Sequence, residues 1–559
     1  MKKTIGIGIQ SFEKIIENHC FYIDKTHFIK EWWENHDDVT LITRPRRFGK
    51  TLNMNMLECF FSVNKKDKKH IFEGLSIWKE EKYRQMQGTY PVISLSFANI
   101  KENEFKQACQ RIRQLISEVY LDYYFLLDSK NLVPPEKIML QKNMENPDPI
   151  TALNQLSRFL FKHYGKKVIL LLDEYDTPLQ EAYIHGYWKE LTDFIRNLFN
   201  STFKTNPYLD RALMTGITRI SKESIFSDLN NLTVVTATSD AYADCFGFTQ
   251  KEVRESLEKY GLSANISKVK DWYDGFIFGR HRDIYNPWSI INYLKTQKLS
   301  CYWANTSSNA LVDKLIREGS PHIKESMEDL LKGKALCLEI DEPMVYNQLD
   351  YNENAVWGLL LTSGYLKANP YKTNEKTGRD RYELTLTNKE VRIMFETMIQ
   401  QWFRQSVGEY NGFIKALLLG NCKEMNAYMN RIALATFSYF DSGNRPSGAE
   451  PERFYHGFVL GLIIELADKY NITSNRESGF GRYDVMLEPQ KKDDFAIIME
   501  FKVRDEKEEA SLEDTAKEAL KQIERQQYST ALKAKGIPAT QIRNYGFAFE
   551  GKKVLIKTS

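Results

Sequence analysis

The sequence predicts an α/β protein with a parallel β-sheet in its N-terminal part and a second, smaller α/β unit at its C-terminal end. Three observations carry this prediction. Residues 41–57 read as a strand, a tight loop and the start of a helix. Residues 167–172 form a continuous apolar run, as in a strand buried on both faces of a parallel sheet. Residues 495–503 read as another apolar strand and end in a Glu-x-Lys pattern.

The loop in the first segment ends in a phosphate-binding pattern. Gly49, Lys50 and Thr51 match the end of G-x-x-x-x-G-K-[ST], and Arg44 stands where the pattern has its first glycine. Backbone N–H groups and the helix dipole favour a phosphate at such a loop. Gly49 would allow close approach, Lys50 would reach the outer phosphates, and the Thr51 hydroxyl would bind Mg²⁺. The alternative is a chance occurrence of Gly-Lys-Thr.

The same loop is rich in arginine. Arg44, Arg46 and Arg47 add positive charge, and the sequence leaves open where these side chains point. We count Arg46, Arg47 and Phe48 among the candidate nucleotide contacts.

Adjacent carboxylates follow the apolar run at residues 167–172. In phosphate-loop ATPases an aspartate at this point holds Mg²⁺ and a glutamate activates water. Asp173 fits the first role and Glu174 the second, whereas Asp176 would support either or cap the next turn. The alternative is a core strand that ends at a polar turn. The presence of both this run and the Gly-Lys-Thr loop favours a nucleotide site.

A third strand is predicted at residues 212–219. Thr215 or Thr218 would sense the terminal phosphate, and Arg219 would stabilise charge during transfer. An equally good interpretation is a strand-end turn with a solvated arginine.

The C-terminal part places an acid on each of two predicted strands. Asp484 lies in residues 479–487, and Glu500 and Lys502 lie on one face of the following strand because side chains alternate along a strand. Two carboxylates would bind Mg²⁺, and Lys502 would position the attacking water. Glu452 and Gln522, on the flanking helices, would complete the site. Arg482 would contact a phosphate.

Composition restricts the setting and the partners. At 559 residues the chain should hold about three or four domains. The net charge of +3 gives no global polycation to attract nucleic acid. The 7 cysteines are scattered without a C-x-x-C pair, which suits a reducing cytoplasm. No apolar run approaches the ~18 residues of a membrane helix, and the N-terminus lacks the apolar core of a signal peptide. We therefore predict a cytoplasmic protein without a membrane partner.

We predict three domains, at residues 1–245, 246–440 and 450–559, with a linker rich in Gly, Pro and Ser at 441–451. The middle domain reads as helical, and a helix at 356–366 followed by a hairpin suits a winged-helix-like module. Residues 414–437 read as a helical spacer. For the aromatic segment 271–287, we favour packing between small subdomains over a functional lid.

Several motifs resemble a known family. Residues 44–51, 172–176 and 215–221, together with 272–276 and 285–289, are similar to motifs of the bacterial AAA-ATPase-like family. Members of this family often carry a C-terminal nuclease-like domain of the PD-(D/E)XK class, which the pattern around Asp484, Glu500 and Lys502 also resembles. The resemblance implies an additional-strand P-loop ATPase domain followed by a restriction-endonuclease-like α/β domain.

Two functions follow as hypotheses. The first is an ATP-controlled, Mg²⁺-dependent nuclease or nucleic-acid processing factor that acts on DNA or RNA. The second is an ATP-dependent signalling switch or scaffold whose nuclease-like domain binds without cutting. Arg44, at the altered position of the loop, keeps the second hypothesis open. The sequence leaves the oligomeric state and any protein partner undetermined.

Overall fold

The structure is a computed structural model. It describes residues 2–204, 206–219, 225–226, 229–304, 310–317, 319–331, 333–339, 346–349, 352–373, 380–404, 407–436, 459, 463, 466, 469–478, 481–491, 493–505, 509–550 and 553–559. The chain forms two compact units. One comprises Met1–Val312 and Ala335–Met394, and the other comprises Asp313–Lys334 and Phe395–Ser559. The three predicted domain boundaries stay predictions.

The first unit is built on a five-stranded sheet with the order β2-β3-β4-β1-β5, in which every pair of neighbours is parallel. Its strands are β1 (Val39–Thr43), β2 (Val92–Ser96), β3 (Val168–Asp173), β4 (Leu209–Gly216) and β5 (Leu232–Val235). All residues of β1 and β3 are buried, as their apolar runs predict. The predicted parallel α/β fold is confirmed, and β4 is the additional strand between β1 and β3.

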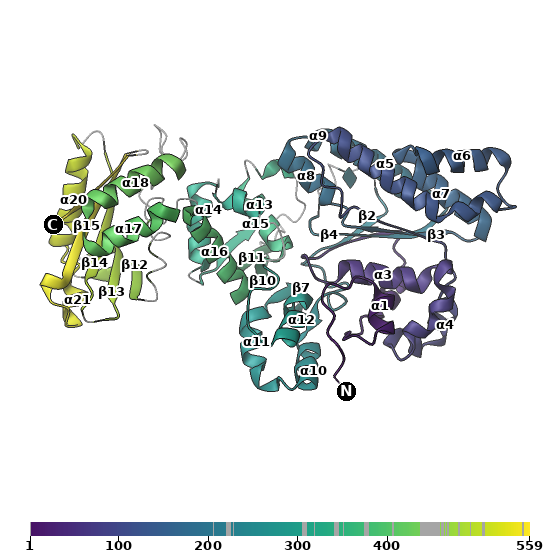
Figure 1. Cartoon of the computed structure of the whole chain (residues 1–559), viewed down its shortest axis with the longest axis horizontal. Coiled ribbons are helices and arrows are strands. Elements are labelled where there is room, and N and C mark those ends of the chain that lie inside the picture. Colours follow the sequence, from purple (N-terminus) through teal and green to yellow (C-terminus); the bar gives the residue numbers. More distant parts are fainter. Residues whose placement is uncertain are drawn as a thin grey trace. The chain divides into compact units, whose positions relative to one another are not determined.

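Helices cover both faces of this sheet (Figure 1). On one face lie α1 and α3, and on the other lie α5, α7 and α9. The helices up to β4 are α1 (Phe12–Glu17), α2 (His27–Glu34), α3 (Lys50–Phe61), α4 (Glu81–Met86), α5 (Phe105–Asp122), α6 (Pro134–Glu145), α7 (Pro149–Tyr164), α8 (Thr177–His185) and α9 (Trp188–Phe199). Local sequence sets their ends. In α7 the Asp148 side chain accepts from the Ile150 N–H, and Gly165 ends the helix in the left-handed region at φ 67°.

Two small sheets complete the first unit. The first has the order β6-β8-β7 and packs with α10, α11 and α12 around a largely aromatic core. The second has the order β10-β11-β9, and its β10–β11 hairpin follows α15 directly, as the helix-plus-hairpin prediction requires. The elements are β6 (Phe248–Thr249), α10 (Gln250–Tyr260), α11 (Ile266–Tyr273), β7 (Phe276–Phe278), β8 (His281–Tyr285), α12 (Pro287–Thr296), β9 (Leu336–Glu339), α15 (Glu353–Thr362), β10 (Leu366–Thr373) and β11 (Asp380–Leu386).

The second unit is built on a mixed sheet with the order β12-β13-β14-β15-β16, in which only β14 and β15 are parallel. Its strands are β12 (Tyr470–Ser478), β13 (Gly481–Pro489), β14 (Ala496–Val503), β15 (Ile542–Glu550) and β16 (Lys553–Thr558). The other helices among the described residues are α13 (Ala310–Arg317), α14 (Pro321–Leu331), α16 (Lys389–Arg404), α17 (Val407–Leu419), α18 (Cys422–Thr436), α20 (Leu512–Arg525) and α21 (Thr530–Ala534). This sheet and its helices confirm the predicted restriction-endonuclease-like α/β fold.

Side chains of this sheet alternate between two cores. Ile497 and Met499 on β14 share a core with residues of α17 and α18. The segment predicted as a spacer therefore packs on the sheet. Ile498 faces Ile523 and Tyr528, in α20 and just beyond it. Glu452 and the predicted linker lie outside the described residues. Among the described helices, none combines the length and apolar character needed to cross a membrane, and the cytoplasmic location stays a prediction.

Candidate functional site

The phosphate-binding pattern lies at the edge where β1, β4 and β3 end. Gly49 caps α3 with a left-handed backbone at φ 85°, and a Cβ atom there would meet nothing within 4 Å. Glycine is therefore required by the backbone conformation and leaves open space in front of it. Because α3 begins at Lys50, its N-terminal N–H groups and dipole favour an anion at this point.

Thr51 and Asp173 are in direct contact across this edge. The Thr51 hydroxyl donates to Asp173 Oδ2 at 2.6 Å, and the Thr215 hydroxyl of β4 donates to Oδ1. Burial raises the pKa of Asp173, and the two hydroxyl groups act against that rise. Hydroxyl and carboxylate oxygens are ligands that suit Mg²⁺, so the donor set fits the ion. The roles of these residues as ligands stay predictions.

Lys50 is engaged by its own loop. Its side chain is buried, and Nζ donates to the carbonyl oxygens of Arg44 and Pro45 at 3.0 Å each. Burial lowers the pKa of Lys50, while the neighbouring Glu174 and Asp173 carboxylates oppose the shift. A bound phosphate would therefore have to replace these backbone carbonyls as the hydrogen-bond acceptor of the Lys50 ammonium group.

Arg44, at the position of the missing glycine, points away from the open side of the loop. Its guanidinium is buried and donates to the carbonyls of Thr43 at 2.9 Å and Thr236 at 2.8 Å. It also donates to the carbonyls of Ala241 and Tyr242 at 3.3 and 3.4 Å. The arginine satisfies carbonyl groups that would otherwise be buried without a donor.

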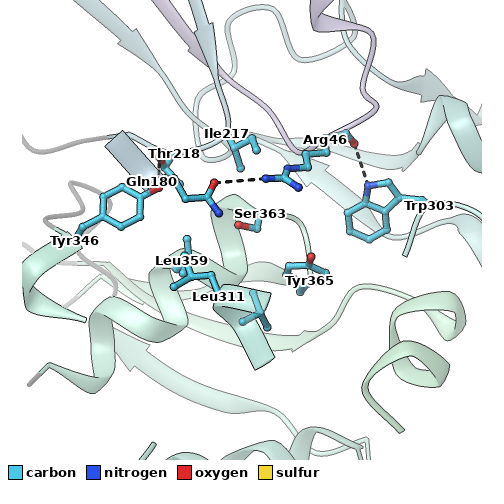
Figure 2. Close-up of a pocket in the computed structure, with 11 residues that line it drawn as sticks. Arg46, Gln180, Ile217, Thr218, Trp303, Leu311, Tyr346, Leu359, Ser363 and Tyr365 are labelled. Carbon is cyan, nitrogen blue, oxygen red and sulfur yellow. Dashed lines mark hydrogen bonds between the residues drawn. The ribbon is translucent and has the colours of Figure 1, made fainter. Parts of the chain in front are cut away.

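The next three loop residues point in different directions. Arg46 donates to Gln180 Oε1 of α8 at 3.4 Å (Figure 2). Arg47 is exposed and lies over the Trp288 ring, 4.5 Å from its centroid. The Phe48 ring is buried and packs edge-on against Phe276 of β7 at 4.7 Å between centroids. The aromatic segment 271–287 thus packs against the loop through Phe276, and the choice between subdomain packing and a lid stays a prediction.

The acidic turn after β3 is held by the end of β4. Asp176 is buried and accepts from the N–H of Ile217 at 3.0 Å and the N–H of Thr218 at 2.8 Å. Burial raises the pKa of Asp176, and the Thr218 hydrogen bonds counteract it. Glu174, with its backbone at φ 52°, accepts from the Thr177 hydroxyl at 3.2 Å.

Arg219 follows Thr218 at the end of β4 and is half-buried. Its predicted role in stabilising charge stays a prediction.

A pocket lies beside the loop (Figure 2). It is lined by Arg46, Gln180, Ile217, Thr218, Trp303, Leu311, Val312, Tyr346, Leu359, Ser363 and Tyr365. The Trp303 indole N–H donates to the Arg46 carbonyl at 3.0 Å, and the amide of Asn286 donates to the same oxygen at 3.3 Å. The loop backbone is therefore held from the side opposite to the sheet.

A buried acid supports this arrangement. Glu390 Oε1 accepts from the Trp303 backbone N–H at 2.6 Å, and Oε2 accepts from the Ser289 hydroxyl at 2.8 Å. Burial raises the pKa of Glu390 to about 7, against hydrogen bonds from Ser289, Ala304 and Trp303 that lower it. Sequence reasoning missed Glu390 and Trp303, because no local motif marks them.

The predicted C-terminal residues share one face of the sheet. β13 and β14 pair Val485 with Met499, and one further step of this register places Asp484 opposite Glu500. Asp484 Oδ2 accepts from the Phe501 N–H at 2.8 Å. Two residues after Glu500, half-buried Lys502 lies on the same face.

Gln522 reaches this face from α20. Its side-chain amide donates to Glu500 Oε1 and, at 3.2 Å, to the Tyr528 hydroxyl. Glu500 is only 3% exposed. The structure thus brings Gln522 together with the two acids, and carboxylate oxygens fit a divalent cation. Glu452 lies outside the described residues, and Arg482 falls in β13, where its phosphate contact stays a prediction.

These features define a P-loop ATPase-like domain and a nuclease-like α/β domain. Residues 6–226 match the family described as "Predicted AAA-ATPase", and residues 450–559 match the PD-(D/E)XK nuclease superfamily. The predicted family resemblance is confirmed for both parts of the chain. The chain is also 24% identical over 548 residues to "Uncharacterized protein in vnfD 5'region" of Azotobacter chroococcum mcd 1, covering 96% of this chain and 95% of that protein.

The Arg44 contacts generate a stability prediction. Arg44→Gly restores the first glycine of the pattern, yet it leaves the carbonyls of Thr236, Ala241 and Tyr242 without these donors. Each buried, unsatisfied polar group costs about 1–3 kcal/mol. We expect the thermal unfolding midpoint to fall by about 5 °C or more. Arg47→Ala, in the same loop, should leave the midpoint nearly unchanged. Equal midpoints for Arg44→Gly and wild type would contradict this account.

The Glu390 environment generates a pH prediction. In the folded chain the pKa of the Glu390 carboxyl is raised from its ordinary value of 4.5 to about 7, so this carboxyl keeps its proton up to about pH 7. The folded state therefore binds the extra proton between these values, and the stability that this provides is lost as the pH rises. The unfolding midpoint of wild type should fall more steeply from pH 5.5 to pH 8 than that of Glu390→Gln, measured by calorimetry. Parallel pH profiles would refute this assignment.

Proposed function

We propose that the first unit binds ATP with Mg²⁺ at the loop closed by Gly49. The single observation that supports this most is the 2.6 Å hydrogen bond between Thr51 and Asp173. It places a hydroxyl oxygen and a carboxylate oxygen beside the N-terminus of α3, where phosphate is favoured. When bound, Mg²⁺ supplies charge neutralisation at the outer phosphates. Lys50 would bind those phosphates, and Glu174 would hold the attacking water.

Of the other loop residues, Arg46 is the stronger candidate for a nucleotide contact. Its side chain lines the pocket beside the loop, whereas Arg47 lies over Trp288. The Phe48 ring is buried against Phe276, so Phe48 would meet the nucleotide through its backbone. Thr215 would contribute through its hydrogen bond to Asp173. Arg219 would stabilise charge at the terminal phosphate.

Lys50→Met tests the nucleotide proposal. A charge-assisted hydrogen bond contributes about 1.5–3 kcal/mol, so ATP affinity should fall about 10- to 100-fold. Isothermal titration calorimetry with ATP and Mg²⁺ measures this. Lys251→Met, on α10 with 85% of its side chain exposed, is the control and should bind as wild type does. Unchanged affinity in Lys50→Met would refute nucleotide binding at this loop.

For the second unit we propose Mg²⁺-dependent cleavage of DNA or RNA. Asp484 and Glu500 would hold the ion, Gln522 would fix the Glu500 carboxylate, and Lys502 would hold the attacking water. Mg²⁺, when bound, supplies Lewis-acid activation of the phosphodiester. Glu452 would add a third carboxylate from the preceding helix.

Cleavage assays test this site. Asp484→Ala and Lys502→Met should each lower Mg²⁺-dependent cleavage about 100-fold or more. Lys553→Met, an exposed lysine on β16, should cut as wild type does. Equal cleavage by all four proteins would end the catalytic proposal. If ATP controls cleavage, adding ATP should change the wild-type rate and leave the Lys50→Met rate unaffected.

A second function, an ATP-dependent switch or scaffold, is favoured by one observation. Lys50 donates to two carbonyls of its own loop, so a bound phosphate would draw Lys50 away from them and free the loop to shift. The Arg46 carbonyl next to them is held by Trp303 and Asn286, which would be displaced with it. In this function ATP changes the tryptophan fluorescence of the wild type, and no cleavage follows with any nucleic acid.

A further inference from the structure

A second group of metal-binding side chains lies away from both proposed sites. His27 begins α2, and Asp244 and Cys245 lie in the segment before β6. Among the described residues these three form a group in which one imidazole nitrogen, one carboxylate oxygen and the sulfur all lie within 4.8 Å of one another. Asp244 and Cys245 are neighbours in the chain, but His27 lies more than 200 positions before them, so no local sequence motif marks the group.

The spacing within the group is close to that of ligands around one ion. His27 Nε2 lies 3.5 Å from Asp244 Oδ1, and Cys245 Sγ lies 3.9 Å from the same oxygen. Ligands at ~2.0–2.3 Å from a tetrahedral zinc ion are about 3.3–3.8 Å apart. A small shift of these side chains is enough to bring all three atoms to one ion.

Acidic side chains border the cysteine of this group. The Nε2 atom of His27 is buried and makes no hydrogen bond of good geometry among the described residues. The Cys245 thiol donates a hydrogen bond to Glu31 Oε2 at 3.2 Å and lies 3.9 Å from Asp244 Oδ1, so two acids border the sulfur. Lys25, which donates to the Asp244 backbone carbonyl at 2.8 Å, is already paired with Glu252 at 2.7 Å. A divalent cation would relieve this local excess of negative charge.

We propose that His27, Asp244 and Cys245 bind a zinc ion. Thiolate and imidazole ligands favour zinc over Mg²⁺ and Ca²⁺, which prefer all-oxygen sites. On binding, the Cys245 thiol loses its proton to solvent and a Zn–S bond forms. With three protein ligands, the fourth position is open to water. The His27 and Asp244 side chains are 36% and 47% exposed, which gives the ion a path from solvent.

The ion would stabilise the segment of chain that contacts the phosphate-binding loop. The segment that carries Asp244 and Cys245 accepts hydrogen bonds from Arg44 through the Ala241 and Tyr242 carbonyls. Its Cys245 carbonyl also accepts from Asn53 of α3 at 3.0 Å. An ion shared with His27 would tie this segment to α2. Because the ion binds the folded chain, it would also raise thermal stability.

Metal content tests the proposal directly on the full-length chain. Protein purified with zinc present and then desalted should carry about one zinc per chain by inductively coupled plasma mass spectrometry. Cys245→Ser and Asp244→Asn should each lower this at least fivefold. Cys59→Ser, an equally buried cysteine on α3, is the matched control and should keep its zinc.

Cobalt gives a second readout that does not depend on how the variants fold. Cobalt added to metal-free wild type should produce a thiolate-to-cobalt absorption band, and Cys59→Ser should show the same band. Wild-type protein that holds less than a tenth of an equivalent of zinc and shows no such band would overturn the proposal. So would zinc content in folded Cys245→Ser equal to that of wild type.

Discussion

The first unit depends on a parallel register that ends three strands at one edge. β4 lies between β1 and β3, so the loop after β1 and the acids after β3 are separated by the width of a single strand. The hydrogen bond from Thr51 to Asp173 spans that width, and Thr215 of β4 contributes from between them. This strand order brings helix α3 and the Asp173 carboxylate to a shared space.

Buried carbonyl groups set the second constraint. A loop that turns tightly at a sheet edge exposes several carbonyl oxygens to the interior, and each needs a donor. Here the Arg44 guanidinium and the Lys50 ammonium supply donors from inside, and Trp303 supplies one to Arg46 from the other side. The loop is therefore stabilised without a ligand. Phosphate binding then becomes an exchange of partners for Lys50.

Much of this architecture was predictable because its signals are local. Apolar runs mark β1 and β3, and a helix followed by a hairpin marks α15 to β11. Alternation along β14 puts Glu500 and Lys502 on one face. The direction of Arg44 was not predictable, because it depends on carbonyls near residue 240. Trp303 contacts a carbonyl 257 positions away, and no spacing rule connects such distant residues.

The packing of the C-terminal helices was likewise not predictable from local sequence. The segment 414–437 was recognised as helical, yet an apolar helix face does not reveal which sheet will cover it. In the structure α17 and α18 bury that face on β13 to β16. His27, Asp244 and Cys245 illustrate the point for a candidate site. Each residue is unremarkable in its own segment, and only the fold brings His27 next to Asp244 and Cys245.

The central claim is that one polyphosphate and its cation lie between Gly49 and Asp173. A crystal structure of the chain soaked with a non-hydrolysable ATP analogue and magnesium tests this most directly. The account predicts phosphate density over the N-terminus of α3, Lys50 turned from the Arg44 carbonyl toward that density, and an ion within reach of Thr51 and Asp173. Analogue bound elsewhere, with the Thr51–Asp173 hydrogen bond and the Lys50 contacts unchanged, would contradict it.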